Sequence, residues 1–410
     1  MLTINLEMGL VMTAKKKAVW MVSGGPMQAS LAQVIKKSDF QLIVSDGSKD
    51  CFCRALADVF LNIDTFDATA HKLAATDLLK NFDICAVITV SADCHYTVNA
   101  LAQSLDLPHL PVEISEICRH KIKTREMLRL AGLPQPWSLS TDSCSAAKTY
   151  WERFGGEAVL KSTDSSGSRG FQIMKKFEQL NEKSFAYSKN FGTTGQVIIE
   201  KRLDVDPEQI SEASVETVWS NGVMHWLNWV DRIFGLDLVH LPELNNTFAA
   251  VEGVELAHLN PARRERHIKL EVYRQMEAAG KALGMDRVKG AHVLKGDIFF
   301  DRSGPVILEL TPRCSGGWDS CGSSVLRGSK IHEGLLQLAL GHKLDLDLWT
   351  KYFHFDFAEN SVAVLAQVDQ NAVDCIGRNF VMCESSKSME SAIVGAVAKL
   401  KKGEYFVPLL

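Results

Sequence analysis

Three short apolar runs in the first hundred residues constrain the fold of this chain most strongly. They read AVWMVS (residues 18–23), QLIVS (residues 41–45) and ICAVITV (residues 84–90), and helical stretches separate them. Strands that are apolar throughout belong to parallel sheets covered by helices on both faces. The pattern predicts a Rossmann-like α/β domain over residues 18–120, after a short extension over residues 1–17. Ligands bind off the carboxyl ends of such strands.

The composition argues against several classes of protein. The 410 residues include 45 basic and 49 acidic side chains, a formal net charge of −4, so nothing favours a nucleic-acid partner. No apolar run reaches the length of a membrane span, and the amino-terminal residues lack the order of a signal peptide. The ten cysteines contain no CxxC pair, and several lie in apolar segments, as in a reducing compartment. We therefore expect a cytoplasmic protein that acts on small molecules.

Beyond the first domain the pattern changes to shorter strands and two clear helices. The segment ISEICRHKIKTREMLRLA (residues 114–131) reads as one helix, and the prolines that follow it suggest a boundary near residue 138. A second helix is predicted to end at Gly284. Its apolar residues, spaced by 4, 4, 3 and 4 positions, share one face: Ile268, Val272, Met276, Ala279 and Leu283.

The segment VLKSTDSSGSRG (residues 159–170) places a lysine before a Ser/Gly loop. In a P-loop the lysine follows the glycines, so this loop is of another kind. Lys161 ends an apolar strand and supplies a fixed positive charge, while small loop residues let backbone N–H groups approach phosphate oxygens. A solvated hairpin loop is an equally good interpretation of this segment alone, because Ser/Gly loops are common.

Two acids, Asp297 and Glu309, form the strongest pair of candidate residues. They lie on two predicted strands, HVLKGDIFF and PVILEL, joined by a tight turn at residues 301–304. A hairpin can set the two side chains across from each other, where unpaired carboxylates would repel unless a cation lies between them. Carboxylates beside nucleotide phosphates suit Mg²⁺. Arg313 follows as a bidentate donor for a carboxylate or phosphate. A surface hairpin with solvated acids is the alternative.

The segment VIIEKRLD (residues 197–204) reads as a strand that leaves the core with a polar pair at its end. Glu200 and the backbone near Leu203 can hydrogen-bond the edge of an adenine. Taken alone, an ordinary exposed strand end is the simpler interpretation.

In this order the segments resemble the ATP-grasp superfamily over roughly residues 17 to 335. The resemblance rests on HKIKTREMLRLAGLPQP, VLKSTDSSGSRG, VIIEKRLD, SEASVE and KGDIFFDRSGPVILELTPRCSGG. It implies a Rossmann-like pre-ATP-grasp domain and then a two-lobed α+β ATP-grasp domain over residues 121–335. The lid lobe would cover residues 138–203 and the metal and substrate lobe residues 204–335. Residues 336–410 would form a carboxy-terminal α/β segment that completes the substrate side or an interface.

The resemblance also implies a role for each matching residue. Two lysines would contact the ATP phosphates, the Ser/Gly loop would close over them as a lid, and the hinge after the strand would read adenine. The acids of the hairpin would bind Mg²⁺ or Mn²⁺, and an arginine would stabilise the charge of an acyl phosphate. The residues so assigned are, for ATP, Lys121, Lys161, Ser165, Ser166, Gly167, Ser168, Glu200, Lys201, Leu203, Glu208 and Glu212; for the metal, Asp297, Glu309 and Thr311; for the substrate, Arg313, Ser315, Gly316 and Gly317; and for catalysis, Arg313 and Lys161.

The sequence departs from the family pattern at three points. Thr311 stands where most members have asparagine, so the coordination of a second metal is open. The lid has only two glycines, which implies a stiffer closure. The spacer DVDPEQI before the ribose acid is long, so Glu208 and Glu212 are alternatives for that role.

The resemblance implies a carboxylate–amine ligase that uses ATP, forms an acyl phosphate, and releases ADP and phosphate. The segment TPRCSGGWD is similar to that of members that join amino acids or small carboxylates to amines, and homodimers are common among such proteins. A carboxylase that activates bicarbonate is one alternative, although no biotinyl MKM segment is present. A non-catalytic nucleotide-binding module is another.

An NAD-dependent oxidoreductase is the alternative from a different enzyme class. Asp46 lies 46 − 24 = 22 residues after Gly24, which is typical of a ribose-binding acid. The glycine run lacks the G-x-G-x-x-G spacing, however, and this interpretation leaves Lys161, Asp297 and Arg313 unexplained.

Overall fold

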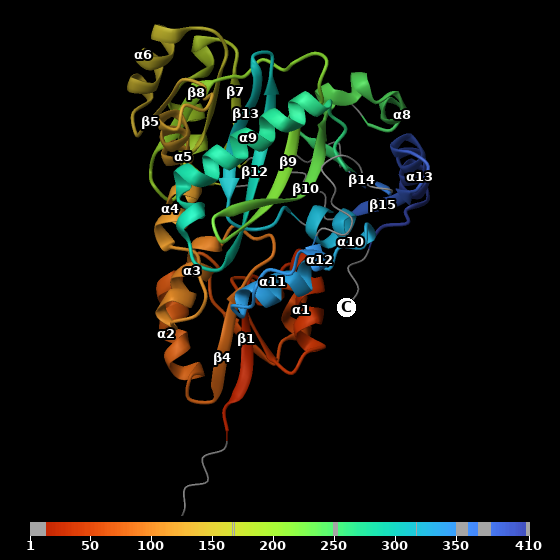
Figure 1. The fold of residues 1–410 in the computed structure, drawn as a ribbon. Helices are drawn as coiled ribbons and strands as arrows, with labels where there is room; N and C mark the ends of the chain where they lie inside the picture. Colours follow the sequence, from red (N-terminus) through yellow and green to blue (C-terminus); the bar gives the residue numbers. More distant parts are fainter. Residues whose placement is uncertain are drawn as a thin grey trace, which may run out of the picture.

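The computed structural model describes residues 14–406 except 166, 168, 249–252, 317, 350–359 and 368–378. Its first sheet is the parallel sheet that the apolar runs predict (Figure 1). The strand order is β3-β2-β1-β4, and each pair is parallel. Its strands are β1 (Lys16–Val22), β2 (Gln41–Asp46), β3 (Val59–Asn62) and β4 (Phe82–Ile88).

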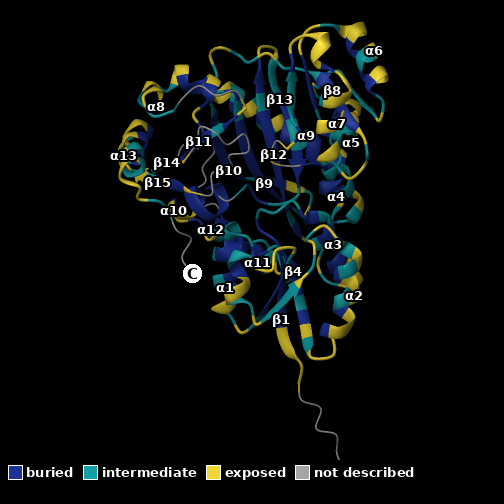
Figure 2. Cartoon of the chain, turned by 180° about the vertical axis from the view of Figure 1, so that it is seen from behind, coloured by how far each residue is buried: buried dark blue, intermediate teal, exposed yellow. Residues whose placement is uncertain are grey.

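Two antiparallel sheets follow. A four-stranded sheet has the order β5-β8-β6-β7, and a seven-stranded sheet has the order β13-β12-β9-β10-β11-β14-β15. Figure 2 shows the seven-stranded sheet largely in the colour of buried residues. The strands are β5 (Ser138–Thr141), β6 (Ala158–Ser162), β7 (Gln172–Met174), β8 (Val197–Lys201), β9 (Glu212–Ser220), β10 (Val223–Phe234), β11 (Glu255–Asn260), β12 (Ala291–Asp301), β13 (Gly304–Thr311), β14 (Ser361–Ala366) and β15 (Phe380–Ser385).

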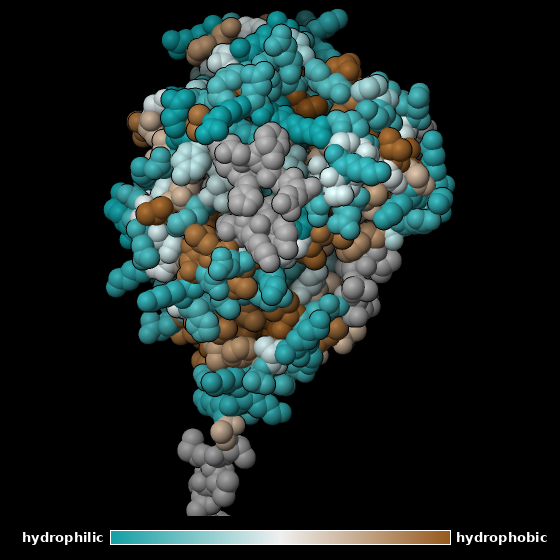
Figure 3. All heavy atoms as spheres, turned by 45° about the vertical axis from the view of Figure 1, so that its right-hand side comes forward, coloured by the Kyte–Doolittle hydropathy of each residue, from teal (hydrophilic) through white to brown (hydrophobic). Residues whose placement is uncertain are grey.

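The helices cover the sheets. None of those in the described part of the chain is both long and apolar enough to span a bilayer. On the face drawn in Figure 3, hydrophilic residues predominate and hydrophobic ones form smaller groups. The helices are α1 (Ala29–Lys36), α2 (Ala68–Leu78), α3 (His95–Ser104), α4 (Val112–Arg119), α5 (Lys121–Leu130), α6 (Cys144–Phe154), α7 (Glu182–Asn190), α8 (Pro242–Asn245), α9 (Arg266–Leu283), α10 (Ser324–Leu326), α11 (Ile331–Ala339), α12 (Leu346–Trp349) and α13 (Met389–Lys402).

The carboxy-terminal part of the chain packs in two places. Helix α11 lies beside α1 on the first sheet, and its Ile331 and Leu335 share a hydrophobic core with Val19 and Leu42 (Figure 1). Strands β14 and β15 instead extend the seven-stranded sheet, and α13 packs on them. The last strands therefore belong to the same sheet as the candidate hairpin, although the predicted domain limits themselves stay a prediction.

The prediction of a single helix over residues 114–131 is wrong, because the helix is interrupted at His120. This residue is extended, with φ −103° and ψ 109°, and it separates α4 from α5. The backbone N–H of Lys121 donates to the carbonyl of Thr163 at 2.8 Å instead of continuing the helix. The long-range bond places Lys121 at the amino end of α5, against the Ser/Gly loop.

Helix α9 confirms the periodic pattern. Its residues Val272, Met276, Ala279 and Leu283 are buried against the seven-stranded sheet. Gly284 ends the helix in the left-handed conformation, with φ +88°, as a glycine there favours.

Candidate nucleotide and metal site

A buried ion triad joins the lysine strand to the predicted adenine hinge. Nζ of Lys161, on β6, lies 2.5 Å from Oε1 of Glu200 on β8. Nε of Arg125, on α5, donates to Oε2 of the same carboxylate at 3.0 Å. Burial on its own would raise the pKa of Glu200, but the charges of Arg125 and Lys161 outweigh it and lower the pKa to about 2. Glu200 is therefore ionised at neutral pH and holds Lys161 in place.

Arg125 also connects this triad to the candidate metal hairpin. Its Nη1 donates to the carbonyl of Leu308 on β13 at 2.5 Å, one residue before Glu309. The side chain is fully buried. Sequence reasoning missed Arg125, and its one local signal was the spacing of four residues from Lys121 on the same helical face.

The second predicted phosphate lysine lies under the Ser/Gly loop. Nζ of Lys121 donates to the backbone carbonyl of Ser165, and the hydroxyl of Ser165 donates to the carbonyl of Arg169 at 2.8 Å. Gly167 and Gly170 have φ of +63° and +74°, which only glycine adopts readily. Two lysines therefore flank the base of this loop, while its predicted ligands Ser166 and Ser168 lie outside the described residues.

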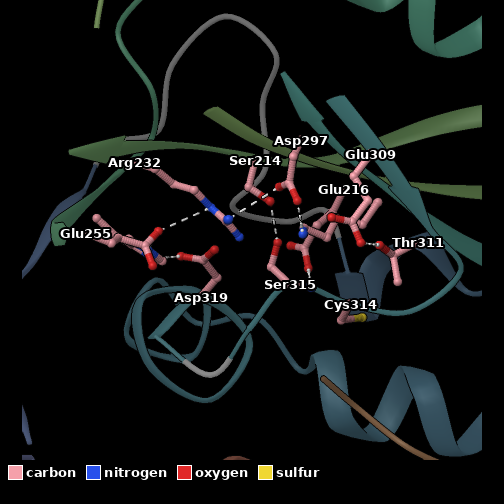
Figure 4. Close-up of polar contacts among 12 residues, drawn as sticks. Ser214, Glu216, Arg232, Glu255, Asp297, Glu309, Thr311, Cys314, Ser315 and Asp319 are labelled. Carbon is pink, nitrogen blue, oxygen red and sulfur yellow. Dashed lines mark hydrogen bonds and ion pairs between the residues drawn. The ribbon is translucent and has the colours of Figure 1, made fainter. Parts of the chain in front are cut away.

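Asp297 and Glu309 lie directly across from each other, as the hairpin prediction requires. They are register partners on β12 and β13, and Oγ1 of Thr311 lies 3.5 Å from Oε1 of Glu309 (Figure 4). Two cationic side chains lie close to the carboxylate of Asp297. Nζ of Lys295 lies 2.5 Å from its Oδ2, and Nη1 of Arg232 lies 3.5 Å from its Oδ1.

The donors of the hairpin fit a hard divalent cation. They are oxygens from two carboxylates and a hydroxyl, the ligand type that Mg²⁺ prefers, and Oδ1 of Asp297 is buried without a hydrogen bond. No group of three or more His, Cys, Asp or Glu side chains could hold a metal within the part of the chain that the structure describes. A metal at Asp297 and Glu309 would therefore need ligands from a nucleotide or water, which is how proteins usually bind Mg²⁺.

Arg313 lies at the junction with the first sheet. Its Nε and Nη2 lie 2.9 and 2.5 Å from Oδ1 of Asp93, which follows β4. The backbone N–H of Cys314 donates to the carbonyl of Val90 at 3.1 Å. The loop after β13 therefore meets the carboxyl end of a parallel strand, where ligands bind in sheets of this kind.

The residues after Arg313 differ in their accessibility. Ser315 is fully buried: its N–H donates to Oε1 of Glu216 at 2.6 Å, and its hydroxyl lies 2.6 Å from that of Ser214 (Figure 4). These bonds shape the loop from inside. A Cβ on Gly316 would meet nothing within 4 Å, whereas Gly317 lies outside the described residues.

A further charged network, absent from the sequence prediction, borders Asp297. Nε of Arg232 lies 3.6 Å from Oε1 of Glu255 (Figure 4). The two ring nitrogens of His258 lie 2.8 Å from Glu255 and from Asp319. Burial would lower the pKa of His258, but the two carboxylates outweigh it and raise the pKa to about 9.

The two alternatives for the ribose acid lie in different surroundings. Glu208 is exposed in a turn, where its N–H donates to Oδ1 of Asp206 at 3.0 Å. Glu212 lies on β9 as the register partner of Arg232. Burial, opposed by Arg232 and assisted by Asp297, raises the pKa of Glu212 to about 8. Glu212 therefore lies close to Asp297, whereas Glu208 lies in an exposed turn.

The remaining hinge residues lie at the end of β8. Lys201 is half-buried, with Nζ 3.8 Å from Oδ2 of Asp204, and Leu203 follows in the connection to β9.

Asp46, the ribose-binding acid of the oxidoreductase alternative, uses its carboxylate to accept hydrogen bonds from nearby backbone N–H groups. Its Oδ2 accepts from the N–H of Gly24 at 2.7 Å and its Oδ1 from the N–H of Ser48 at 2.8 Å. A Cβ at Gly24 would lie 2.6 Å from Sγ of Cys51, so the glycine serves close packing there. Both carboxylate oxygens stabilise the loop, which weighs against a dinucleotide site.

The arrangement of the sheets is that of the ATP-grasp fold. An L-amino acid ligase from Bacillus licheniformis superposes with a TM-score of 0.66 and 17% identity, over 87% of this chain and 82% of that one. An ADP complex of N5-carboxyaminoimidazole ribonucleotide synthetase gives a TM-score of 0.68 at 14% identity, over 96% and 99% of the two chains. A biotin carboxylase from Campylobacter jejuni gives 0.62 at 17%, over 86% and 75%. At these identities the likeness shows the fold.

Sequence relatives add little about activity. No protein-family model matches the chain. An uncharacterized protein of Sinorhizobium fredii (strain NBRC 101917 / NGR234), called y4rH, is 25% identical over 260 residues, 63% of this chain. The chain spans 49% of the length of that relative, about half.

Proposed function

We propose that the protein is an ATP-dependent ligase that joins a carboxylate to an amine through an acyl phosphate. The observation that carries the proposal is the pairing of Asp297 with Glu309 across a hairpin that Arg125 ties to Glu200 and Lys161. Nucleotide phosphates and a metal would meet between these groups, and the ATP-grasp fold of ligases in the solved structures supports this interpretation.

The side chains divide the chemistry among them. Lys121 and Lys161 would bind the phosphates, and Glu309 with Asp297 would hold Mg²⁺, which neutralises phosphate charge when bound. A carboxylate oxygen of the substrate would attack the γ-phosphorus of ATP. The bond between this phosphorus and the oxygen that bridges it to the β-phosphate would break, and ADP would leave with that oxygen. Arg313, oriented by Asp93, would stabilise the charge on the acyl phosphate. The amine would then displace phosphate and lose a proton.

No side-chain nucleophile is needed for this reaction. Phosphoryl transfer depends mainly on positioning and on neutralising charge, which buried lysines and arginines supply. Cys314, which follows Arg313 in the chain, is buried, and burial raises the pKa of its thiol. Cys314 therefore contributes packing and not a thiolate.

A product analysis tests the proposal. The protein is incubated with ATP, Mg²⁺ and pools of carboxylates and amines, and the nucleotide products are separated by chromatography. We expect ADP and phosphate in amounts that depend on one acid and one amine together. Release of AMP and pyrophosphate would contradict the acyl-phosphate route.

Replacing Glu309 tests the role of the hairpin directly. Glu309→Gln keeps the shape of the side chain but removes the charge that a metal requires, so turnover should fall by about a thousandfold. The thermal unfolding midpoint should stay near that of the wild type. Glu384→Gln, at an exposed position of β15, is the matched control and should keep full activity. Unchanged turnover in Glu309→Gln would contradict the metal role.

A further inference from the structure

Lys295 is a cation built into the candidate metal site. It lies on β12 two residues before Asp297, so the two side chains share one face of the strand. Only 3% of Lys295 is exposed, and its Nζ lies 2.5 Å from Oδ2 of Asp297. A lysine buried to this degree needs a counter-charge, and Asp297 supplies it.

The second oxygen of Asp297 also faces a cation. Nη1 of Arg232 lies 3.5 Å from Oδ1 (Figure 4), whereas Lys295 contacts Oδ2. Both oxygens of Asp297 therefore point toward positive side chains. A carboxylate in this position has little negative charge left for bridging two divalent cations.

The other side of the hairpin is poorer in ligands than two metals require. Unlike Asp297, Glu309 forms no ion pair with a cationic side chain among the described residues. Its neighbour Thr311, 3.5 Å away, offers a neutral hydroxyl. Two adjacent divalent cations would add four positive charges beside Lys295. The hairpin supplies two carboxylates, one of them already paired with Lys295, so the nucleotide phosphates would have to offset the rest.

We infer that the ammonium group of Lys295 takes the place of a second divalent cation, so that the site binds a single Mg²⁺ through Glu309 and the remaining oxygen of Asp297. The inference rests on the proposed function, because the metal would arrive with a nucleotide. In this arrangement Oδ2 of Asp297 pairs with Lys295, and Oδ1, which accepts no hydrogen bond, is the oxygen left for the metal. Lys295 would then supply a positive charge beside the nucleotide phosphates that does not depend on the metal concentration.

The number of bound metal ions tests this inference without reference to activity. The full chain is equilibrated with a non-hydrolysable ATP analogue and excess Mn²⁺, and protein-bound Mn²⁺ is counted by electron paramagnetic resonance after dialysis. We expect one Mn²⁺ per bound nucleotide in the wild type. We expect two in Lys295→Met, because removal of the ammonium frees Asp297. The control Lys295→Arg keeps the charge and should keep one.

The possible outcomes separate the inference from the proposed function. Two Mn²⁺ per nucleotide in the wild type would overturn the inference and leave the ligase proposal intact. A folded Lys295→Met that still binds one Mn²⁺ would also overturn it. Absence of nucleotide binding in the wild type would overturn both. The wild-type count is decisive even if Lys295→Met fails to fold.

Discussion

His258 is a buried side chain whose two nitrogens both face carboxylates. Nδ1 lies 2.8 Å from Oδ1 of Asp319 and Nε2 lies 2.8 Å from Oε1 of Glu255. Because an ionised carboxylate only accepts hydrogen bonds, both nitrogens must carry protons, which makes the ring a cation. Trp318 closes one side of the ring in an edge-on contact, with ring centroids 4.8 Å apart. The residue therefore stabilises the protein only while it is charged.

The stability of the protein should fall at alkaline pH, because His258 loses its proton and with it the attraction to the two carboxylates. Its folded pKa of about 9 lies above its usual 6.5, so its contribution is complete below pH 6.5 and disappears as pH rises through 9. The shift corresponds to about 3 kcal/mol. Denaturant unfolding at pH 6.5 and 9.5 should show this loss in the wild type and not in His258→Gln. The exposed control His267→Gln should retain it, and an equal loss in His258→Gln would contradict the assignment.

Single residues also decide which charges are free to bind a ligand. In the triad, the negative charge of Glu200 balances only one of the two positive charges of Arg125 and Lys161, so one net positive charge remains. Removing one partner from a buried ion pair commonly costs several kcal/mol, because the remaining charge stays buried. The triad therefore makes a preformed positive site for phosphate instead of a flexible lysine.

At the level of elements, α9 packs so closely on β9 that it requires a glycine. A Cβ on Gly280 would lie 2.0 Å from Cζ2 of Trp219, which is buried. The indole therefore occupies the space that any larger residue would need. Because β9 pairs with both β10 and β12, this contact sets the position of the helix over the strands that carry the site.

Gly280→Ala should destabilise the protein by about 1–3 kcal/mol, because overpacking forces the indole or the helix to move. The better helix propensity of alanine, worth about 1 kcal/mol, would offset part of this cost. Gly25→Ala is a matched control, because its added Cβ meets nothing within 4 Å and its φ is −65°. Urea unfolding measures both, and equal stability of Gly280→Ala and the wild type would rule out the close contact.

On the scale of the whole molecule, the first sheet contributes to the site through Asp93. The loop after β4 carries Asp93 to Arg313, and the carbonyl of Val90 accepts from Cys314. Gln28 holds the same loop, because its Oε1 accepts from the N–H of Val90 at 2.9 Å. The first sheet therefore orients the arginine that the proposed reaction needs.

Asp93→Asn should lower kcat and leave the KM for ATP nearly unchanged, which would distinguish orientation of the substrate from binding of ATP. Loss of the carboxylate charge would free Arg313 to swing, and a misplaced group of this kind can lower kcat by about 100-fold. The KM for ATP should change little, because Lys161 and Lys121 lie on other elements. Steady-state kinetics with each substrate varied in turn measures this. Asp83→Asn, exposed on β4, is the control, and a rise confined to the KM for ATP would refute the assignment.

The sequence by itself determined the features that depend on neighbouring residues. Alternation of apolar strands and helices specified the parallel sheet, and the tight turn after Asp301 set Asp297 opposite Glu309. The break at His120 escaped prediction because a hydrogen bond to Thr163, more than forty residues away, overrides the local preference for helix.

Only the tertiary structure decided how the charges of the site are paired. Arg125 meets Glu200 and Leu308, and Arg313 meets Asp93, across 75, 183 and 220 residues of sequence. Lys295 is near Asp297 in sequence, but its burial shows that the lysine compensates the acid instead of facing water. Local patterns report which face of a strand or helix is apolar. Which buried charge neutralises which depends on distances that exist only once distant elements have packed together.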